Sequence, residues 1–314
     1  MKNILSALIL GMFAALQTTF VLADPPIPAF YEAVTKMTPN GKLGQVIKKE
    51  QIKTSVNGAQ AWRIAYISSD VAGRKTISTG VIMAPVGPAP KEGRPILAWA
   101  HGTTGSAQNC GPSQIIDPTR ALNQYFLMDG NSWTDFGIPN GQEFINQGYV
   151  VVATDYQGLG GGGRHQYSVA ATNGMDTLNA ARAAVSMKET GANKKTVIYG
   201  WSQGGGATIA LAGMPDYIKQ TDTAADNLEI LGFVALAPQD ISIFAPTGKI
   251  DQAAADKYFQ GLQKMFLDNV FNFTHATMYY WGTQAAFPNL KLTDIFTDEG
   301  VKIANSIYSN KCMH

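Results

Sequence analysis

Runs of apolar residues along the chain predict two kinds of strand. Ala61–Ser68 and Lys75–Ala84 are rich in β-branched and aromatic residues, and Ser69–Gly73 between them is a predicted hairpin connection. Shorter runs without polar alternation are typical of strands covered on both faces of a parallel sheet. These runs are Pro95–Ala100, Tyr149–Ala153, Thr196–Tyr199 and Leu231–Ala237. With a first strand expected near Gln45–Gln51, the pattern predicts an α/β fold with a mostly parallel sheet.

Helical spacing of apolar residues predicts one helix before the strand at Leu231–Ala237 and two helices after it. We expect a helix over Asp176–Glu189, with Asp176 or Thr177 as its N-cap and Gly191 closing it. Two further helices are predicted over Ala253–Val270 and Thr297–Ile307.

The region after Asp240 is also rich in aromatic side chains. They are Phe271, Phe273, Tyr279, Tyr280, Trp281 and Phe287. A helical aromatic block beside an α/β core suggests a cap that lines a site for an acyl chain. The alternative is that these rings only pack on one another.

The stretch Thr196–Gly206 carries the strongest chemical signal, because a predicted strand runs into the sequence Gly-Trp-Ser-Gln-Gly and then into helix formers. This is the G-x-S-x-G pattern of a nucleophile elbow, with Ser202 at the N-terminus of a helix. Backbone N–H groups and the helix dipole favour developing negative charge there. The alternative is an ordinary loop in a chain with 32 glycines. The flanking strand and helix favour the elbow.

A second glycine motif follows the strand Pro95–Ala100 and runs from His101 to Gly105. An HG-x-x-G loop after an early central strand can supply one backbone N–H to an oxyanion hole, and the residue after the serine supplies the other. We therefore expect the oxyanion donors to be Gln203 and either Thr103 or Thr104. The alternative is a glycine turn with a structural histidine.

Other polar residues near strand ends are interpreted as structural. Asp155 follows a buried strand but precedes the serine, so a hydrogen-bonding role is favoured over catalysis. The run Gly160–Gly163 matches neither a phosphate-binding loop nor a dinucleotide fingerprint, so we expect a mobile loop. His165 is interpreted as a residue of that loop.

The N-terminus predicts export. Lys2 is followed by an apolar run from Ile4 to Leu16 and by Val21-Leu22-Ala23, so residues 1–23 are predicted to be a signal peptide cleaved near Ala23. An uncleaved anchor is the alternative, although Gln17 interrupts the apolar run short of the roughly 20 residues that a span needs. We expect a secreted or periplasmic protein with no stable membrane span. The formal charge of +1 gives no reason to expect a nucleic-acid partner.

The chain contains two cysteines, Cys110 and Cys312. In an exported protein an even count suggests a bridge between them, and two free thiols are the alternative.

Together these motifs resemble the secretory lipases, a family with the α/β-hydrolase fold. The similar features are the strand pair, the sequence AWAHGTTG, the sequence VVATDYQGLG, the elbow YGWSQGGG and the helical cap. The resemblance covers Asp24 to the C-terminus. It implies a serine nucleophile, a cap over a lipid-binding tunnel and a bond between Cys110 and Cys312. It also divides the chain into a core over 24–240 and an incomplete cap over 241–314.

The general base is the missing part of this picture. Triad order in the family is serine, then an acid, then a histidine on later strands, and this chain has no matching positions. We expect the final strands of the sheet to be absent. If the chain uses its own residues, Asp240 is the possible acid and His275 or the terminal His314 the possible base, although a packed cap histidine is the other interpretation of His275.

The function predicted from sequence is an exported serine hydrolase that acts on carboxylic esters, most simply a triacylglycerol lipase or esterase of lipid catabolism. Its partner would be a lipid or a small acyl ester, and no metal or organic cofactor is implied. The alternative is an inactive hydrolase fragment or a binder of apolar ligands without a working triad. Peptidases and acyltransferases share the same elbow, so substrate does not follow from fold.

Overall fold

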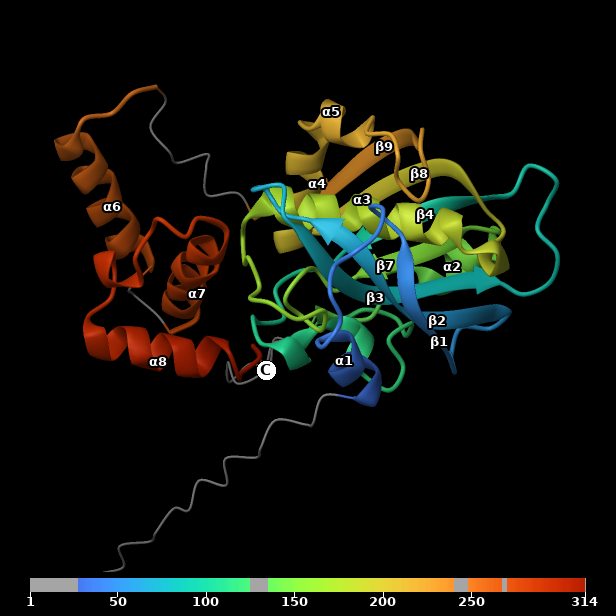
Figure 1. Ribbon diagram of the computed structural model, residues 1–314, viewed down its shortest axis with the longest axis horizontal. Coiled ribbons are helices and arrows are strands. Elements are labelled where there is room, and N and C mark those ends of the chain that lie inside the picture. Colours follow the sequence, from blue (N-terminus) through green and yellow to red (C-terminus); the bar gives the residue numbers. More distant parts are fainter. Residues whose placement is uncertain (1–27, 125–134, 240–247, 267–269, 314) are drawn as a thin grey trace, which may run out of the picture.

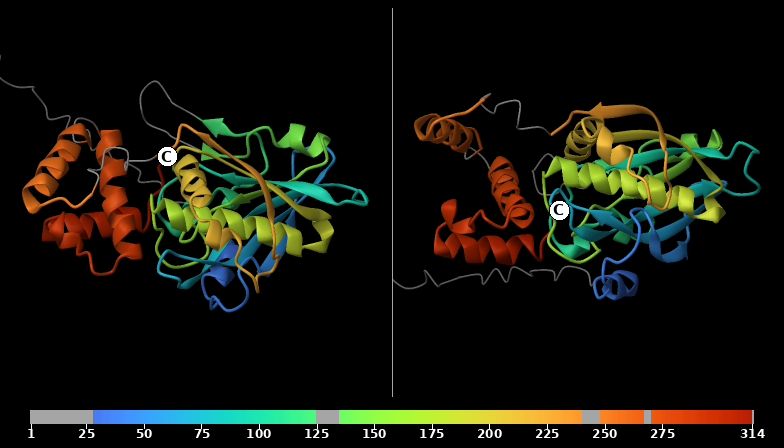
Figure 2. Two further views of the ribbon diagram at one scale, coloured as in Figure 1. Left: turned by 90° about the horizontal axis from the view of Figure 1, so that it is seen from above. Right: turned by 45° about the horizontal axis from the view of Figure 1, so that its top comes forward.

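The computed structural model describes residues 28–124, 135–239, 248–266 and 270–313. The predicted signal peptide, Asp240 and His314 lie outside the described residues. The fold is an α/β core with a group of three helices at one end, as Figures 1 and 2 show from different sides.

The core is a seven-stranded sheet in the order β1-β2-β3-β7-β4-β8-β9. The first four strands in this order pair antiparallel, and β7, β4, β8 and β9 pair parallel. The strands are β1 Val46–Ile52, β2 Ala59–Ser69, β3 Lys75–Pro85, β4 Arg94–Ala100, β7 Val150–Thr154, β8 Ala192–Trp201 and β9 Glu229–Leu236. A separate two-stranded pair joins β5 Asn123–Gln124 to β6 Asp135–Phe136. The α/β prediction with a mostly parallel centre and a β2–β3 hairpin is confirmed.

Helices cover both faces of the sheet. α3 (Ala170–Ser186) and α4 (Gln203–Ala212) pack on one face through residues such as Leu178 and Leu211. α2 (Gly141–Asn146) packs on the other face through Ile145, beside Trp99. α1 (Ala29–Val34) packs on the end of the β2–β3 hairpin, and α5 (Pro215–Ile218) follows α4. Alternate side chains of the central strands therefore enter two separate apolar cores.

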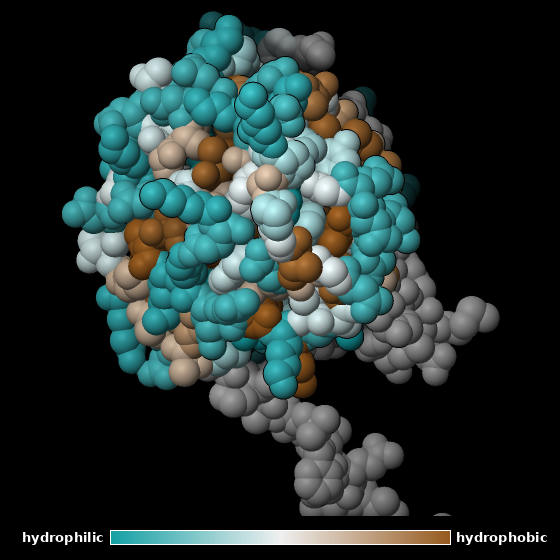
Figure 3. Space-filling model, turned by 90° about the vertical axis from the view of Figure 1, so that its right-hand side faces the viewer, coloured by the Kyte–Doolittle hydropathy of each residue, from teal (hydrophilic) through white to brown (hydrophobic). Residues whose placement is uncertain are grey.

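Three helices form the other group: α6 (Gln252–Phe266), α7 (Val270–Ala286) and α8 (Asp298–Tyr308). They lie beside the core rather than on a sheet face (Figure 1). Their apolar centre is formed by Met278, Trp281 and Tyr308 together with Tyr167 of the core. These helices are expected to be the cap predicted from the sequence. At the far end of the core the surface is mainly hydrophilic, with small scattered hydrophobic patches (Figure 3).

The prediction for α3 is wrong at its start. The helix begins at Ala170 rather than near Asp176, its N-cap is Val169, and it ends at Ser186, before a short 3₁₀ turn that Gly191 closes. Asp176 is completely buried, and its Oδ2 accepts a hydrogen bond from the backbone of Gln157 at 2.8 Å. Aspartate is common at helix N-caps, but Asp176 is instead a buried hydrogen-bond acceptor inside the helix.

The prediction that the last strand is buried on both faces is also wrong. Leu231, Val234 and Leu236 of β9 are each about half exposed, with exposed fractions of 54%, 45% and 46%. Among the described residues β9 pairs with β8 alone, so it is an edge strand. A run of apolar residues without alternation cannot distinguish an interior strand from an apolar edge strand.

Candidate active site

Ser202 lies at the sharp turn between β8 and α4. Its backbone dihedrals are φ 53° and ψ −116°, a conformation that residues other than glycine rarely adopt. Such strain persists only where the surroundings enforce it, and it is typical of functional positions. The structure thus places Ser202 in the conformation that a nucleophile elbow requires.

Glycines on both sides of Ser202 make this turn possible. A Cβ atom on Gly200 would lie 2.2 Å from the carbonyl oxygen of Gly204, and one on Gly204 would lie 1.9 Å from the carbonyl oxygen of Ala100. A Cβ on Gly205 would lie 2.8 Å from the carbonyl oxygen of Leu236 at the end of β9, and one on Gly206 would lie 2.3 Å from the carbonyl oxygen of Gln239. The glycines are therefore required by close approach of backbones.

The backbone of Ser202 is held by three hydrogen bonds. Its N–H donates to the carbonyl of Leu236 at 3.0 Å, and its carbonyl accepts from the N–H of Gly206 at 3.0 Å and of Gln239 at 2.7 Å. The segment that follows β9 thus fixes the elbow from outside. Gln203 is the first residue of α4, where backbone N–H groups have no partner within the helix.

The HG-x-x-G loop directly follows β4, and its start lies against the elbow because Gly204 contacts Ala100 and His101. Thr103 and Thr104 are both 1% exposed. The hydroxyl of Thr103 lies 2.9 Å from the hydroxyl of Tyr167. The loop that carries Thr103 and Thr104 therefore begins against the elbow that carries Gln203.

The last described residues of the chain pair with the same loop. Gly105 and Cys312 form an isolated antiparallel bridge, and the N–H of Met313 donates to the carbonyl of Thr104 at 2.9 Å. Cys110 and Cys312 form a disulfide with a Cα–Cα distance of 5.4 Å. The loop that carries the expected oxyanion donors is thus tied to the segment that follows α8.

Removal of this disulfide is expected to destabilise the protein. The bond joins residues 202 positions apart, so its loss frees a long loop in the unfolded chain and should lower the free energy of unfolding by about 2–4 kcal/mol. Chemical denaturation of the Cys110→Ser/Cys312→Ser variant, compared with the parent protein with and without reductant, measures the effect. An unfolding midpoint that neither the double substitution nor reduction changes would contradict it.

Two histidines that precede Ser202 are buried, and burial disfavours the charged form of each ring. Burial lowers the pKa of His101 to about 4 and that of His165 to about 3. The two ring nitrogens of His101 face the carbonyls of Gly102 and Asp155. His165 Nδ1 lies 2.7 Å from the carbonyl of Gln157, and its Nε2 lies 3.1 Å from Nε2 of Gln203. Neither ring is therefore available to accept a proton from Ser202.

Asp155 has the structural environment that its place in the sequence suggested. Its carboxylate accepts hydrogen bonds from the N–H and hydroxyl of Ser113 and from the hydroxyl of Thr79. Burial nevertheless raises its pKa to about 6. The carboxylate thus anchors the loop after β7 to β3 and to the turn at Ser113.

The helical group docks on the loop after β7 through α7. The guanidinium of Arg164 stacks 3.7 Å from the ring of Trp281 and donates to Oε1 of Gln284 at 2.6 Å. Gly282 packs against the backbone of Tyr167, since a Cβ there would lie 2.5 Å from the Tyr167 nitrogen. The ring of His275 lies 6.4 Å from that of Tyr167. α7 therefore brings His275 toward the residue that contacts Thr103.

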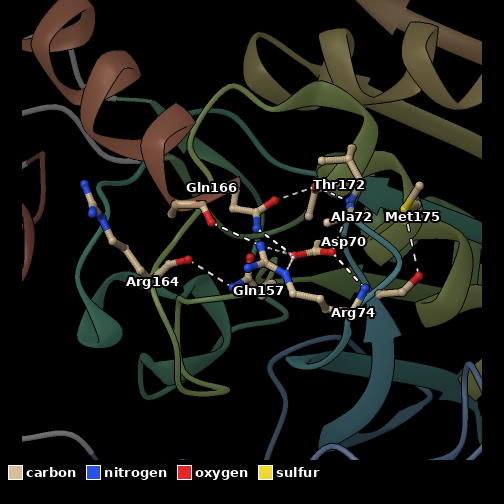
Figure 4. Close-up of polar contacts among 11 residues, drawn as sticks. Asp70, Ala72, Arg74, Gln157, Arg164, Gln166, Thr172 and Met175 are labelled. Atoms are coloured by element: carbon tan, nitrogen blue, oxygen red, sulfur yellow. Dashed lines mark hydrogen bonds and ion pairs between the residues drawn. The ribbon is translucent and has the colours of Figure 1, made fainter. Parts of the chain in front are cut away.

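A second anchor joins the hairpin turn to this loop (Figure 4). Oδ2 of Asp70 accepts from Nε of Arg74 at 2.7 Å and from Nε2 of Gln166 at 3.0 Å. Oε1 of Gln166 in turn accepts from the hydroxyl of Thr172 at 2.6 Å. Arg74 also donates to the carbonyl of Ala285 in α7 at 3.1 Å. Asp70 thus links the hairpin, the loop and the cap helix.

The site predicted from sequence is assembled only in part by the described residues. Gly204 beside Gln203 contacts the start of the loop that carries Thr103 and Thr104. The ring of His275 lies 6.4 Å from that of Tyr167, whose hydroxyl lies 2.9 Å from that of Thr103. Asp240 lies outside the described residues. Sequence reasoning interpreted His165 only as a loop residue and did not single out Tyr167. Their side chains contact Gln203 and Thr103. The signal available was their place directly after a glycine run at a strand end.

The comparisons with known proteins agree with this fold. The model of the secretory lipase family matches residues 142–277, which include the elbow. The chain resembles the secretory lipases. No curated protein matches it.

Solved structures extend the likeness over most of the described core. Candida antarctica lipase A in its closed state is similar at a TM-score of 0.57 and 17% identity, over 92% of this chain and 60% of the lipase. The rice cell wall degrading esterase LipA from Xanthomonas oryzae is similar at 0.56 and 20% identity, over 86% of this chain and 68% of the esterase. The chain thus spans less than two thirds of the lipase, and both likenesses establish the α/β-hydrolase fold.

The described residues contain no cluster of three or more metal-ligating side chains, and none of the described helices has the length and apolar character of a membrane span.

Proposed function

We propose that the chain is an exported serine hydrolase of carboxylic esters, of the lipase type, with Ser202 as the nucleophile. The observation that carries the proposal is the conformation of Ser202, held at φ 53° between β8 and α4 beside the HG-x-x-G loop. A strained turn without a chemical purpose would be a net cost to stability. The family match over the elbow and the lipase and esterase neighbours support the ester class.

In the proposed reaction, Oγ of Ser202 attacks the carbonyl carbon of an acyl ester while a base takes its proton. The N–H groups of Gln203 and of Thr103 or Thr104 stabilise the oxyanion. The alcohol leaves with the proton, and water then attacks the acyl-enzyme to release the carboxylic acid and free Ser202. The aromatic side chains of α7 and its neighbours would contact the acyl chain.

Labelling with a fluorophosphonate probe tests this proposal together with turnover of short-chain and long-chain p-nitrophenyl esters. We expect one labelled peptide, containing Ser202, and faster turnover of the longer acyl chains. A chain that hydrolyses esters without label on Ser202 would contradict the assignment of the nucleophile.

We propose His275 as the base, with Asp240 as its partner acid. The ring nitrogens of His101 and His165, which precede Ser202, already contact other groups. His275 is the remaining histidine among the described residues. His275→Ala is expected to lower kcat by about 10⁶, as removal of the histidine of such a unit does in other serine hydrolases, with partial recovery on addition of imidazole. Initial-rate kinetics with and without imidazole measure this. An unchanged kcat would remove His275 from the reaction.

The second candidate function is a non-catalytic binder of apolar acyl ligands. It is favoured by the burial of His101 and His165, whose low pKa values and hydrogen-bond partners leave Ser202 without a base in the core. This candidate predicts no labelling and no turnover by residues 24–314, but binding of a fluorescent fatty acid that Ser202→Ala leaves unchanged. Turnover abolished by Ser202→Ala would exclude it.

A further inference from the structure

Two neighbouring side chains in the loop before α3 reach the two predicted halves of the oxyanion hole. His165 and Tyr167 are both completely buried, and Gln166 between them is 1% exposed. Their side chains contact different elements: His165 contacts the first residue of α4, and Tyr167 contacts the loop after β4. A single short segment, His165–Tyr167, therefore touches both halves.

The hydrogen bonds of His165 fix which nitrogen carries its proton. The carbonyl of Gln157 can only accept, so Nδ1, 2.7 Å away, is the N–H donor. Nε2 then has a free lone pair and accepts from the side-chain amide of Gln203 at 3.1 Å. The same amide nitrogen donates its other hydrogen to Oδ1 of Asn173 at 3.1 Å. The side chain of Gln203 is thus held at two points.

The hydroxyl of Tyr167 also has two partners. It accepts from Nε2 of Gln239 at 2.9 Å and lies 3.3 Å from Oε1 of the same side chain. It also lies 2.9 Å from Oγ1 of Thr103, where either hydroxyl can be the donor. The backbone N–H of Gln239 in turn donates to the carbonyl of Ser202 at 2.7 Å. Tyr167 therefore connects the loop of Thr103 to the residue that holds the elbow.

The segment itself is held from outside the site. Gln166 donates to Asp70 at 3.0 Å (Figure 4), and α7 packs through Gly282 on the backbone of Tyr167. The position of the segment His165–Tyr167 therefore depends on the β2–β3 hairpin and on α7. A shift of either element would displace the two groups that would bind the oxyanion.

We propose that His165 and Tyr167 are positioning residues that set the distance between the N–H of Gln203 and the N–H of the Thr103–Thr104 turn. The proposal rests on the proposed function for the role of those N–H groups. Oxyanion stabilisation depends on donors placed in advance at the transition-state oxygen, so a small displacement of one donor lowers kcat more than it changes substrate binding.

Tyr167→Phe is the direct test, because it removes the hydroxyl and keeps the ring. We expect kcat and the rate of fluorophosphonate labelling to fall about tenfold, with KM changed less than twofold. Thr103→Val is expected to have a similar effect, and the double variant little more than either single one, because both remove the same contact. His165→Leu is expected to lower kcat independently of them.

Tyr217→Phe is the matched control. Tyr217 is buried, and its hydroxyl also has two partners, Ser69 at 2.7 Å and Asn179 at 2.8 Å, but it contacts neither the elbow nor the loop after β4. We expect this variant to lose stability comparably while its kcat remains unchanged. Equal losses of kcat in Tyr167→Phe and Tyr217→Phe, or kcat within twofold of the parent for Tyr167→Phe, would overturn the proposal.

A measurement without turnover separates this proposal from the proposed function. In ¹⁵N-histidine spectra near neutral pH, we expect one neutral ring protonated on Nδ1, whose Nε2 shift changes in Gln203→Leu. Absence of fluorophosphonate labelling in the parent protein would contradict the proposed function alone. The spectrum would then still test whether His165 contacts Gln203. A charged or Nε2-protonated His165 would overturn the proposal.

Discussion

Ser202→Ala is expected to lower kcat/KM for acyl esters by about 10⁵ to 10⁶ and to abolish fluorophosphonate labelling. In a serine hydrolase that uses a base, removal of the nucleophile costs about as much as removal of the whole catalytic unit. The substitution deletes one oxygen from a half-buried side chain and keeps the backbone hydrogen bonds to Leu236, Gly206 and Gln239. The fold should therefore be retained, and circular dichroism with thermal unfolding verifies this.

The matched control for this prediction is Ser306→Ala. Ser306 is exposed on α8, away from the elbow. Its removal should leave both labelling and turnover at the level of the parent protein. Retention of more than about a hundredth of the parent activity by a folded Ser202→Ala protein would show that another group forms the acyl-enzyme or that water attacks directly.

Gly204→Ala is expected to be the most damaging single substitution for folding. The added carbon would lie 1.9 Å from the carbonyl oxygen of Ala100 and 2.3 Å from its carbonyl carbon, and neither backbone atom can rotate away. β4 and the start of α4 would have to separate. We expect the free energy of unfolding to fall by about 4 kcal/mol or more, or the protein to remain insoluble.

The control for this substitution lies at the other end of the same helix. A Cβ on Gly213 would lie 3.4 Å from the carbonyl oxygen of Ala210, an ordinary contact distance, and the φ of Gly213 is −81°. Gly213→Ala should change the free energy of unfolding by less than about 1 kcal/mol. Chemical denaturation of both variants measures the contrast. Similar stability for the two would mean that the close approach of α4 to β4 is not required.

The sequence predicted the core strands well because their apolar runs are long enough to exclude other structures. β2, β3, β4 and β7 lie within one or two residues of their predicted ranges, whereas β8 begins four residues before its predicted start, at Ala192, and ends two residues later, at Trp201. α3 was mispredicted because Asn173, Asp176 and Thr177 are polar residues that serve as buried hydrogen-bonding partners there, and local patterns interpret such residues as caps or surface. Their burial depends on contacts with segments distant in sequence.

The candidate site likewise has residues that the sequence predicted and residues that it did not. Ser202, Gln203 and the HG-x-x-G loop are defined by local spacing, because glycines are required where backbones touch. No glycine spacing defines His165 and Tyr167, whose one local signal is their place after a glycine run. Their importance comes from contacts with Gln203 and Thr103, which are 38 and 64 residues away in sequence. The position of His275 near Tyr167 similarly depends on how α7 docks.

The disulfide between Cys110 and Cys312 also determines the covalent topology of the molecule. It closes the chain from 110 to 312 into a ring that contains the elbow, the segment His165–Tyr167 and all three helices of the second group. A single break of the peptide chain anywhere inside this ring releases no fragment, because the two pieces stay joined through sulfur. A first proteolytic cut in this ring therefore leaves Ser202 covalently joined to the helices beside it.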